Sequence, residues 1–343
     1  MSTEKQMRKG MEQKKINAGR VEYLDVARGM TMMMIVVFHV LGETNLIYHR
    51  FVVTMGLQVF LFVSGFFFRR FDVKKNLQKL VLPYALLLVT VRVYWDIMLH
   101  MARPGQVLDI LKQIVLGYTL DETWQGNGFY VGIAWFLPML VASRLVYAVI
   151  CKMEKENYFI RGVLSVIVSC AGVVIGNQGI KLPWSLDVAM ATVFFLFLGD
   201  FSHRYQEQVT AFLKKPWLLA VTFVTWGVTV YCFGYSELAV RSYPNGMTFL
   251  LVSTLSMSVV LGISYLIAQY LPYVTKVLCV CGKYSFLILC THILDKSCLV
   301  HSSEINIFLL AAWELFLACI PVMVICLYQL LKKRGTKENE IVG

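Results

Sequence analysis

Apolar runs of about 20 residues recur from one end of the chain to the other, and they restrict its fold more than any other feature. A helix of that length crosses the hydrocarbon core of a bilayer. Inside such a core the backbone must satisfy its own hydrogen bonds, which a helix does. Of the 343 residues, 58% are hydrophobic and 15% are charged, a composition that excludes a soluble domain and a disordered chain. The sequence therefore predicts an all-α, polytopic membrane protein.

Ten transmembrane helices are predicted where apolar runs alternate with polar breaks. They cover residues 27–48, 51–68, 80–100, 129–151, 160–178, 184–201, 216–234, 246–270, 284–300 and 305–331. We expect one membrane domain, residues 27–331, between a basic N-terminal tail (1–26) and a C-terminal tail (332–343). No cleavable signal peptide is expected, because the chain before the first apolar run is polar and further spans follow that run directly.

Lysine and arginine are distributed unevenly between the two sides of this ten-helix arrangement. The loops on one side, together with Arg28, carry 24 of these residues, and the opposite loops carry six. Because positively charged loops face the cytoplasm, both termini are predicted to be cytoplasmic. Topology and contact with anionic membrane lipid then explain the net charge of +11, and no nucleic-acid partner is expected.

Arg28 and His39 lie eleven residues apart in the first predicted span. Eleven helical steps exceed three full turns by only about 20°, so the two side chains share one helix face, about 16 Å apart along the axis. Ionisable residues inside a membrane are functional candidates. His39 is therefore a candidate general base, and Glu43, one turn later, a candidate partner that orients it. The alternative is a histidine that only hydrogen-bonds a neighbouring helix.

Small and basic residues gather at the end of the second predicted span. Ser64 and Gly65 interrupt an aromatic run, where they either weaken the helix and let another backbone approach or serve only close helix packing by small residues. A cationic loop is predicted next, with Arg69, Arg70, Lys74 and Lys75. This loop sets topology, and it is also suited to binding a phosphorylated cytoplasmic ligand.

Further polar side chains fall in the outer half of the predicted bundle. Arg92, Asp96 and His100 follow one another at a spacing of four, either as an intramembrane ion pair or as the wall of an acceptor cavity. His292 is at a depth from which it could face the same cavity as His39. Asp187 begins the sixth span, where an acid is also favoured by the helix N-terminus.

The sequence contains neither a metal-binding pattern nor a serine-nucleophile pattern. Its nine cysteines lie mostly in apolar runs, and Cys279 and Cys281 have no second pair at zinc-ligand spacing. No G-x-S-x-G, Walker or H-E-x-x-H motif occurs. We therefore expect no metal and no covalent serine intermediate.

Several segments occur in an order that resembles the acyltransferase-3 family of membrane O-acyltransferases. They are residues 20–29 with 35–39, which place a basic residue before a histidine with ten positions between them, and then 60–66, 80–84, 134–137, 194–199 and 282–292. Residues 23–25 and 182–187 are most similar to the fucose-acetylase-like branch. The resemblance covers residues 20 to 330.

This resemblance implies transfer of an acyl group, usually acetyl, from cytoplasmic acetyl-CoA to a hydroxyl of an outward-facing or lipid-linked glycan. His39 would be the base, and Glu43 its orienting partner. The CoA phosphates would bind the cationic residues, and the acceptor would contact the polar residues of the outer half. The implied donor residues are Arg28, Ser64, Arg69, Arg70, Lys74, Lys75 and Arg144, and the implied acceptor residues are Arg92, Asp96, Trp135, Asp187 and His292.

Two other classes of membrane protein stay open on the residues alone. A secondary transporter of a small polar or anionic solute also has buried charges, although no pair of Gly- or Pro-broken helices occurs in matching halves. A scaffolding protein would not need His39. For the enzyme we expect a location in the plasma membrane of a bacterium, and the sequence is compatible with a homo-oligomer.

Overall fold

The computed structural model describes residues 21–41, 46–99, 111, 114–117, 132–244, 246–295 and 306–342. Within these ranges the chain is helical and has no β-strand, only an isolated antiparallel bridge between Glu237 and Ser242. The prediction of an all-α fold is confirmed.

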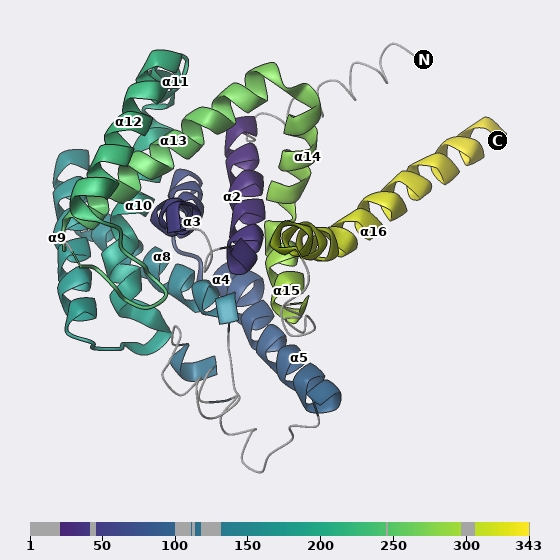
Figure 1. Cartoon of the computed structure of the whole chain (residues 1–343), viewed down its shortest axis with the longest axis horizontal. Helices are drawn as coiled ribbons and strands as arrows, with labels where there is room; N and C mark the ends of the chain where they lie inside the picture. The colour runs from purple at the N-terminus through teal and green to yellow at the C-terminus, as the bar shows by residue number, and fades with distance from the viewer. Residues whose placement is uncertain are drawn as a thin grey trace.

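The described helices pack into one bundle (Figure 1). In chain order they are α2 (Glu22–Leu41), α3 (Leu46–Phe66), α4 (Val73–Asn76), the π-helical turn η1 (Leu77–Val81), α5 (Leu82–Leu99), the 3-10 turn η2 (Gly132–Trp135), α8 (Phe136–Met153), α9 (Tyr158–Asn177), the 3-10 turn η3 (Pro183–Ser185), α10 (Leu186–Arg204), α11 (Gln206–Leu213), α12 (Pro216–Phe233), α13 (Thr248–Tyr270), α14 (Pro272–Lys283), α15 (Ser285–Asp295) and α16 (Ile307–Val342).

Eight helices of the described chain are long and apolar enough to cross a membrane, which confirms a polytopic membrane protein. They are α2, α3, α8, α9, α10, α12, α13 and α16. α14 and α15 meet at an angle of 68°, and together they are apolar enough to form either one broken span or a re-entrant loop. α15 is helical within the predicted span 284–300, of which residues 296–300 lie outside the described residues. α5 is helical where a span was predicted but is not among the eight.

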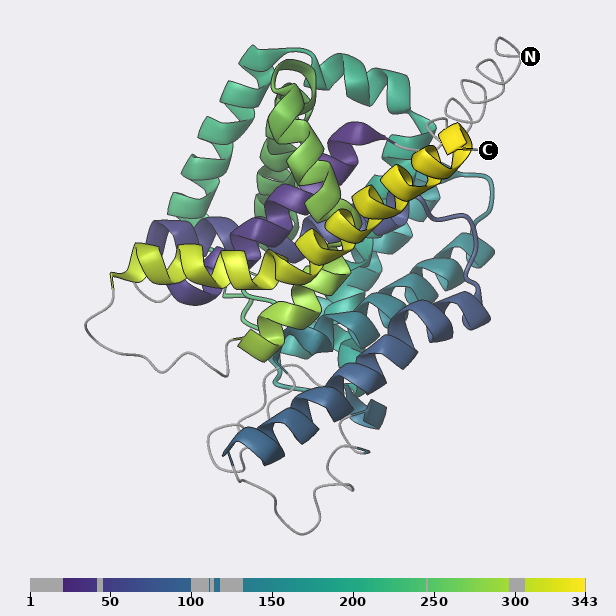
Figure 2. The same ribbon diagram turned by 90° about the vertical axis from the view of Figure 1, so that its right-hand side faces the viewer.

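The boundary between the first two spans also differs from the prediction. α2 ends at Leu41 and α3 begins at Leu46, so His49 and Arg50 belong to a helix and not to a loop. The beginning of α2 and the end of α16 lie toward the same end of the molecule in both views (Figures 1 and 2). Two termini on one side of the membrane require this arrangement, and the cytoplasmic identity of that side stays a prediction.

Two pairs of glycines allow four helices to cross in close contact. A Cβ atom at Gly29 of α2 would overlap the carbonyl oxygen of Leu278, and one at Gly282 of α14 would overlap that of Asp25. Gly65 of α3 and Gly199 of α10 have the same relation to each other's helices. For Gly65, the structure therefore supports the interpretation as close helix packing.

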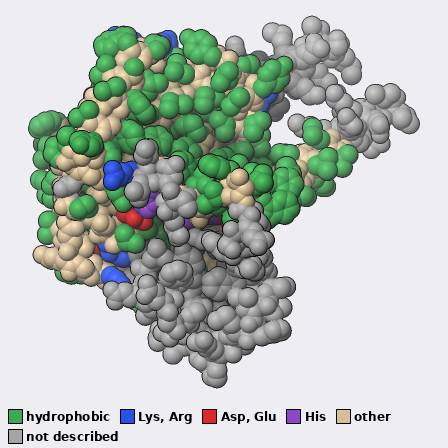
Figure 3. Space-filling model, in the orientation of Figure 1, with side chains coloured by type: hydrophobic (Ala, Val, Ile, Leu, Met, Phe, Trp, Pro, Cys, Tyr) green, Lys and Arg blue, Asp and Glu red, His purple; other side chains and the backbone are tan. Residues whose placement is uncertain are grey.

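The outer surface of the bundle is largely apolar, as lipid contact requires. Figure 3 shows hydrophobic side chains over most of the visible face, with a small group of basic, acidic and histidine side chains among them. α12 and α16 contribute many of the exposed apolar residues, among them Trp217, Phe223, Tyr231, Phe308, Trp313 and Leu327.

Candidate functional site

His39 of α2 and His292 of α15 lie side by side inside the bundle. Their ring centroids are 5.1 Å apart, with the ring planes inclined by 32°. His292 is fully buried, whereas His39 is partly exposed. The structure therefore brings together the two histidines that the sequence analysis singled out at opposite ends of the chain.

Arg28, like His39, contacts α15, but at a point nearer the beginning of α15. Its Nη2 donates a hydrogen bond to Ser285 Oγ at 3.1 Å, and its Nη1 lies 3.7 Å from Asp25 Oδ1. Ser285 and His292 both belong to α15, so α15 runs alongside α2 in the same direction. The predicted common face of Arg28 and His39 is thus confirmed, and it is turned toward α15.

A cavity of about 90 Å³ adjoins His39. Ile35 and Phe38 of α2, one face of α3, Trp135 and residues 237–239 form its walls. Trp135, predicted as an acceptor contact, is therefore a neighbour of His39 across this cavity. Arg28 is not among the lining residues, so the cavity does not extend to the arginine.

The segment that joins α12 to α13 contributes an acidic side chain to this cavity. Glu237 lines it, and a carboxylate oxygen of Glu237 lies 3.5 Å from Nε2 of His49 on α3. The His49 ring also lies against Tyr235, whose ring Arg50 approaches at 5.7 Å. Sequence reasoning missed these residues, because it placed His49 and Arg50 in a loop and found no motif around Glu237.

Asp187 forms a buried ion pair with Arg241. Arg241 Nε lies 2.6 Å from Asp187 Oδ2, and the side chains are 5% and 1% exposed. The other carboxylate oxygen accepts hydrogen bonds from Leu182 N–H and from Arg241 Nη2. Both oxygens of Asp187 are thus engaged within the protein, and they hold the segment between α12 and α13 against the start of α10.

The predicted cationic loop is mostly helix. Arg69 and Arg70 are exposed in the break after α3, but Lys74 and Lys75 lie on α4, which Asp72 caps by accepting a hydrogen bond from Lys75 N–H. The prediction of a loop at both lysines is therefore wrong. An Asp side chain satisfies a free amide at the helix start, which favours a helix there.

The residues outside α2 that were predicted to bind the acyl donor lie on different elements of the fold. Arg69 Nη2 lies 2.8 Å from Nε2 of His203 at the end of α10. Ser64 is half-buried on α3. Arg144 is half-buried on α8, and its Nε is buried without a hydrogen-bond partner in the described structure.

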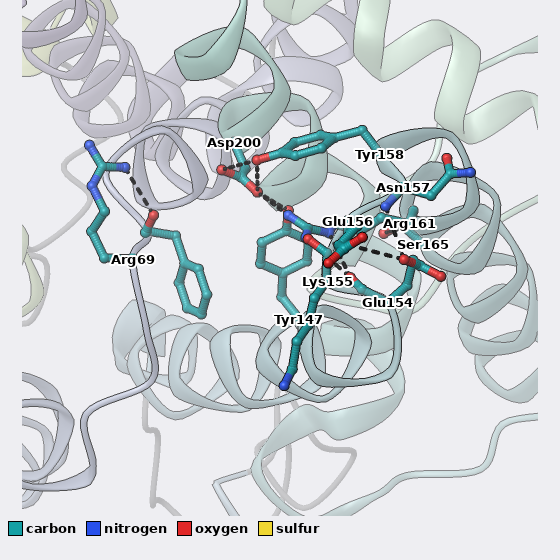
Figure 4. A network of polar contacts seen from close by, with 11 residues as sticks. Arg69, Tyr147, Glu154, Lys155, Glu156, Asn157, Tyr158, Arg161, Ser165 and Asp200 are labelled. Atoms are coloured by element: carbon teal, nitrogen blue, oxygen red, sulfur yellow. Dashed lines mark hydrogen bonds and ion pairs between the residues drawn. The ribbon is translucent and has the colours of Figure 1, made fainter.

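A polar network ties the ends of α8, α9 and α10 together (Figure 4). Tyr147 donates to Asp200 Oδ2 at 2.6 Å, and Arg161 Nη1 lies 3.1 Å from the same atom. Arg161 also donates to the carbonyl oxygens of Glu154 and Lys155. Because Arg161 N–H groups are used within this network, we assign it a structural role.

The turn between α8 and α9 is fixed by a carboxylate. Glu154 accepts hydrogen bonds from the backbone N–H groups of Glu156 and Asn157, and these bonds lower the pKa of Glu154 below its ordinary value. Sequence reasoning missed both this turn and the network, because it interpreted the region as an interhelical loop.

Four predicted site residues are not among the side chains that the structure describes. Glu43 and His100 lie outside the described residues. Arg92 and Asp96 fall on α5, of which only the backbone is described at these positions. Within the described part of the chain, no three His, Cys, Asp or Glu side chains are grouped so that they could hold a metal ion.

The comparisons with known proteins agree with the helical membrane fold. The chain matches the acyltransferase-3 family model, described as an acyltransferase domain, over residues 21–330. No curated protein and no solved structure matches it significantly. Because the family match covers most of the chain, the protein belongs to this family and is a membrane acyltransferase. The fucose-acetylase-like branch stays a prediction.

Proposed function

We propose that this protein transfers an acetyl group from cytoplasmic acetyl-CoA to a hydroxyl group of a cell-surface or lipid-linked glycan. The family match supports acyl transfer in general. The observation that carries the proposal further is that Arg28 and His39 contact one helix, α15, at successive points along α2. A cation near the inner surface and an imidazole deeper in the bundle suit a donor whose phosphates stay at the inner surface while its thioester end reaches into the bundle along α2.

In this proposal the CoA phosphates bind Arg28, with help from the exposed residues Arg69, Arg70, Lys74 and Lys75. The pantetheine arm spans the distance from Arg28 to His39, about 16 Å along the axis of α2. Arg144 is a further candidate for the donor, since its partly buried guanidinium has a nitrogen without a partner.

His39 acts as the general base of the transfer. It removes the proton from the acceptor hydroxyl while that oxygen attacks the thioester carbonyl carbon. The carbon–sulfur bond then breaks, and the CoA thiolate leaves with the proton that the imidazolium returns. The acyl group has moved from sulfur to oxygen, and the histidine is neutral again. His292, packed against His39, is the nearest candidate to stabilise the charge that develops during attack.

The acceptor assignment is supported by the resemblance of residues 23–25 and 182–187 to the fucose-acetylase-like branch. The test uses purified protein with acetyl-CoA labelled in the acetyl group and a lipid-linked glycan extract. We expect CoA release together with label on the glycan. Solute flux across proteoliposomes without CoA, and no label transfer, would instead indicate a transporter.

A further inference from the structure

The side chains that line the cavity beside His39 are mostly apolar. Its lining side chains are apolar apart from His39 and Glu237, and the part that faces α3 is aliphatic. That aliphatic wall consists of Ile35, Val52, Val53, Gly56 and Leu57.

An aliphatic wall suits an alkyl group better than it suits a sugar. Sugar hydroxyls that lose water need hydrogen-bond partners, and burial without them is costly. Glu237 is the second polar group of the lining, but its carboxylate lies beside the His49 ring. An alkyl chain loses nothing by leaving water, and each methylene that fits strengthens binding about fourfold.

The volume of the cavity limits the length of such a chain. An apolar cavity of about 150 Å³ holds benzene with its six carbon atoms, so a cavity of about 90 Å³ has room for roughly three to four carbon atoms. A carbonyl carbon held beside His39 would therefore leave room for an alkyl tail of about three carbons.

Resting on the proposed function, we infer that this cavity is the acyl pocket and that Gly56, facing Ile35, sets the longest acyl chain that the enzyme accepts. A Cβ atom at Gly56 would lie 3.5 Å from Ile35 Cδ1 and 3.8 Å from a Val52 methyl, which is ordinary contact. Gly56→Ala therefore shortens the pocket without displacing backbone. Ile35→Ala should lengthen the pocket, because it removes part of the side chain that faces Gly56.

The experiment measures competition by CoA thioesters against labelled acetyl-CoA on the purified full chain. The competitors are acetyl-, propionyl-, butyryl-, hexanoyl- and octanoyl-CoA, with free CoA as reference. The matched control is Gly227→Ala on α12, because a Cβ at Gly227 meets no atom within 4 Å. This control has the same substitution within a helix but leaves the cavity untouched.

For the wild type and for Gly227→Ala, we expect affinity to rise from acetyl-CoA to butyryl-CoA, by about fourfold for each methylene, and to fall at hexanoyl-CoA. In Gly56→Ala the loss should grow with chain length, with butyryl-CoA weakened about fourfold or more. In Ile35→Ala hexanoyl-CoA should gain affinity. Equal profiles in all four proteins, or an equal loss at every chain length, would overturn the pocket assignment. If no thioester competes with wild type, the proposed function fails and the assignment fails with it.

Discussion

The imidazole rings of His39 and His292 lie 5.1 Å apart, although one belongs to the first helix of the domain and the other to the short helix α15. The same helix α15 meets Arg28 through Ser285. A single helix thus contacts both the residue proposed to bind the donor and the residue proposed to move the proton. The predictions below test the roles of these contacts and of the packing that maintains them.

His292 is expected to support turnover without being the base. Replacing His292 by Gln keeps a hydrogen-bonding side chain at a fully buried position but removes the ring beside His39. We expect the acyl-transfer rate to fall about tenfold to a hundredfold, below the loss expected for the base itself, while donor affinity stays near wild type. Turnover and acetyl-CoA binding are to be measured on the same preparation. A loss of donor binding with unchanged turnover would contradict this role.

Arg28 is expected to act on the donor. Arg28→Ala should raise the KM for acetyl-CoA by about tenfold or more, because a hydrogen-bonded charge is lost. The dependence of KM on salt should flatten, since screening weakens attraction between the cation and the CoA phosphates. The control is Lys214→Ala, an exposed cation at the end of α11. If both variants have the same effect on KM, Arg28 does not have a specific role.

The ion pair between Asp187 and Arg241 is expected to stabilise the fold. Removing either partner leaves a buried charge uncompensated, at a cost of about 3–5 kcal/mol in the free energy of unfolding. We expect Asp187→Ala and Arg241→Ala each to lower the Tm, and the double variant Asp187→Ala/Arg241→Ala to lose less than the sum of the two. Calorimetry in detergent measures this coupling. Additive losses would show that the two charges do not depend on each other.

The close crossing of α2 and α14 is expected to depend on Gly29. Gly29→Ala should destabilise the protein by about 1–3 kcal/mol, because its methyl group would overlap the carbonyl oxygen of Leu278. Gly227→Ala has open space around it and should be neutral or stabilising. Thermal unfolding of the two variants side by side gives the comparison. Equal Tm values would argue against the crossing as described.

The sequence was informative where the relevant physics is local. Apolar run length gave the helices, and helix periodicity gave the common face of Arg28 and His39, which α15 then contacts. Helix boundaries were harder to interpret. The polar residues 42–45 fell inside one predicted span, whereas α2 ends at Leu41 and α3 begins at Leu46. The 68° bend between α14 and α15 was also not foreseen, because only the second of these helices was predicted as part of a span.

Pairings between distant segments were beyond the sequence. Asp187 could be interpreted as an acid at a helix start, and nothing local indicated that Arg241 would neutralise it. The position of Glu237 beside the His39 cavity depends on how the segment after α12 folds back. Periodicity reports which face of a helix is apolar, but it does not report which helix covers that face.

The central claim is that His39 removes the proton of the acceptor, and one comparison tests it most directly. Wild type and His39→Gln are incubated with labelled acetyl-CoA and acceptor, and acetyl transfer and acetyl-CoA binding are both recorded. We expect the variant to bind acetyl-CoA but to transfer acetyl groups at least about a hundredfold more slowly. Transfer by His39→Gln at the wild-type rate would contradict the claim.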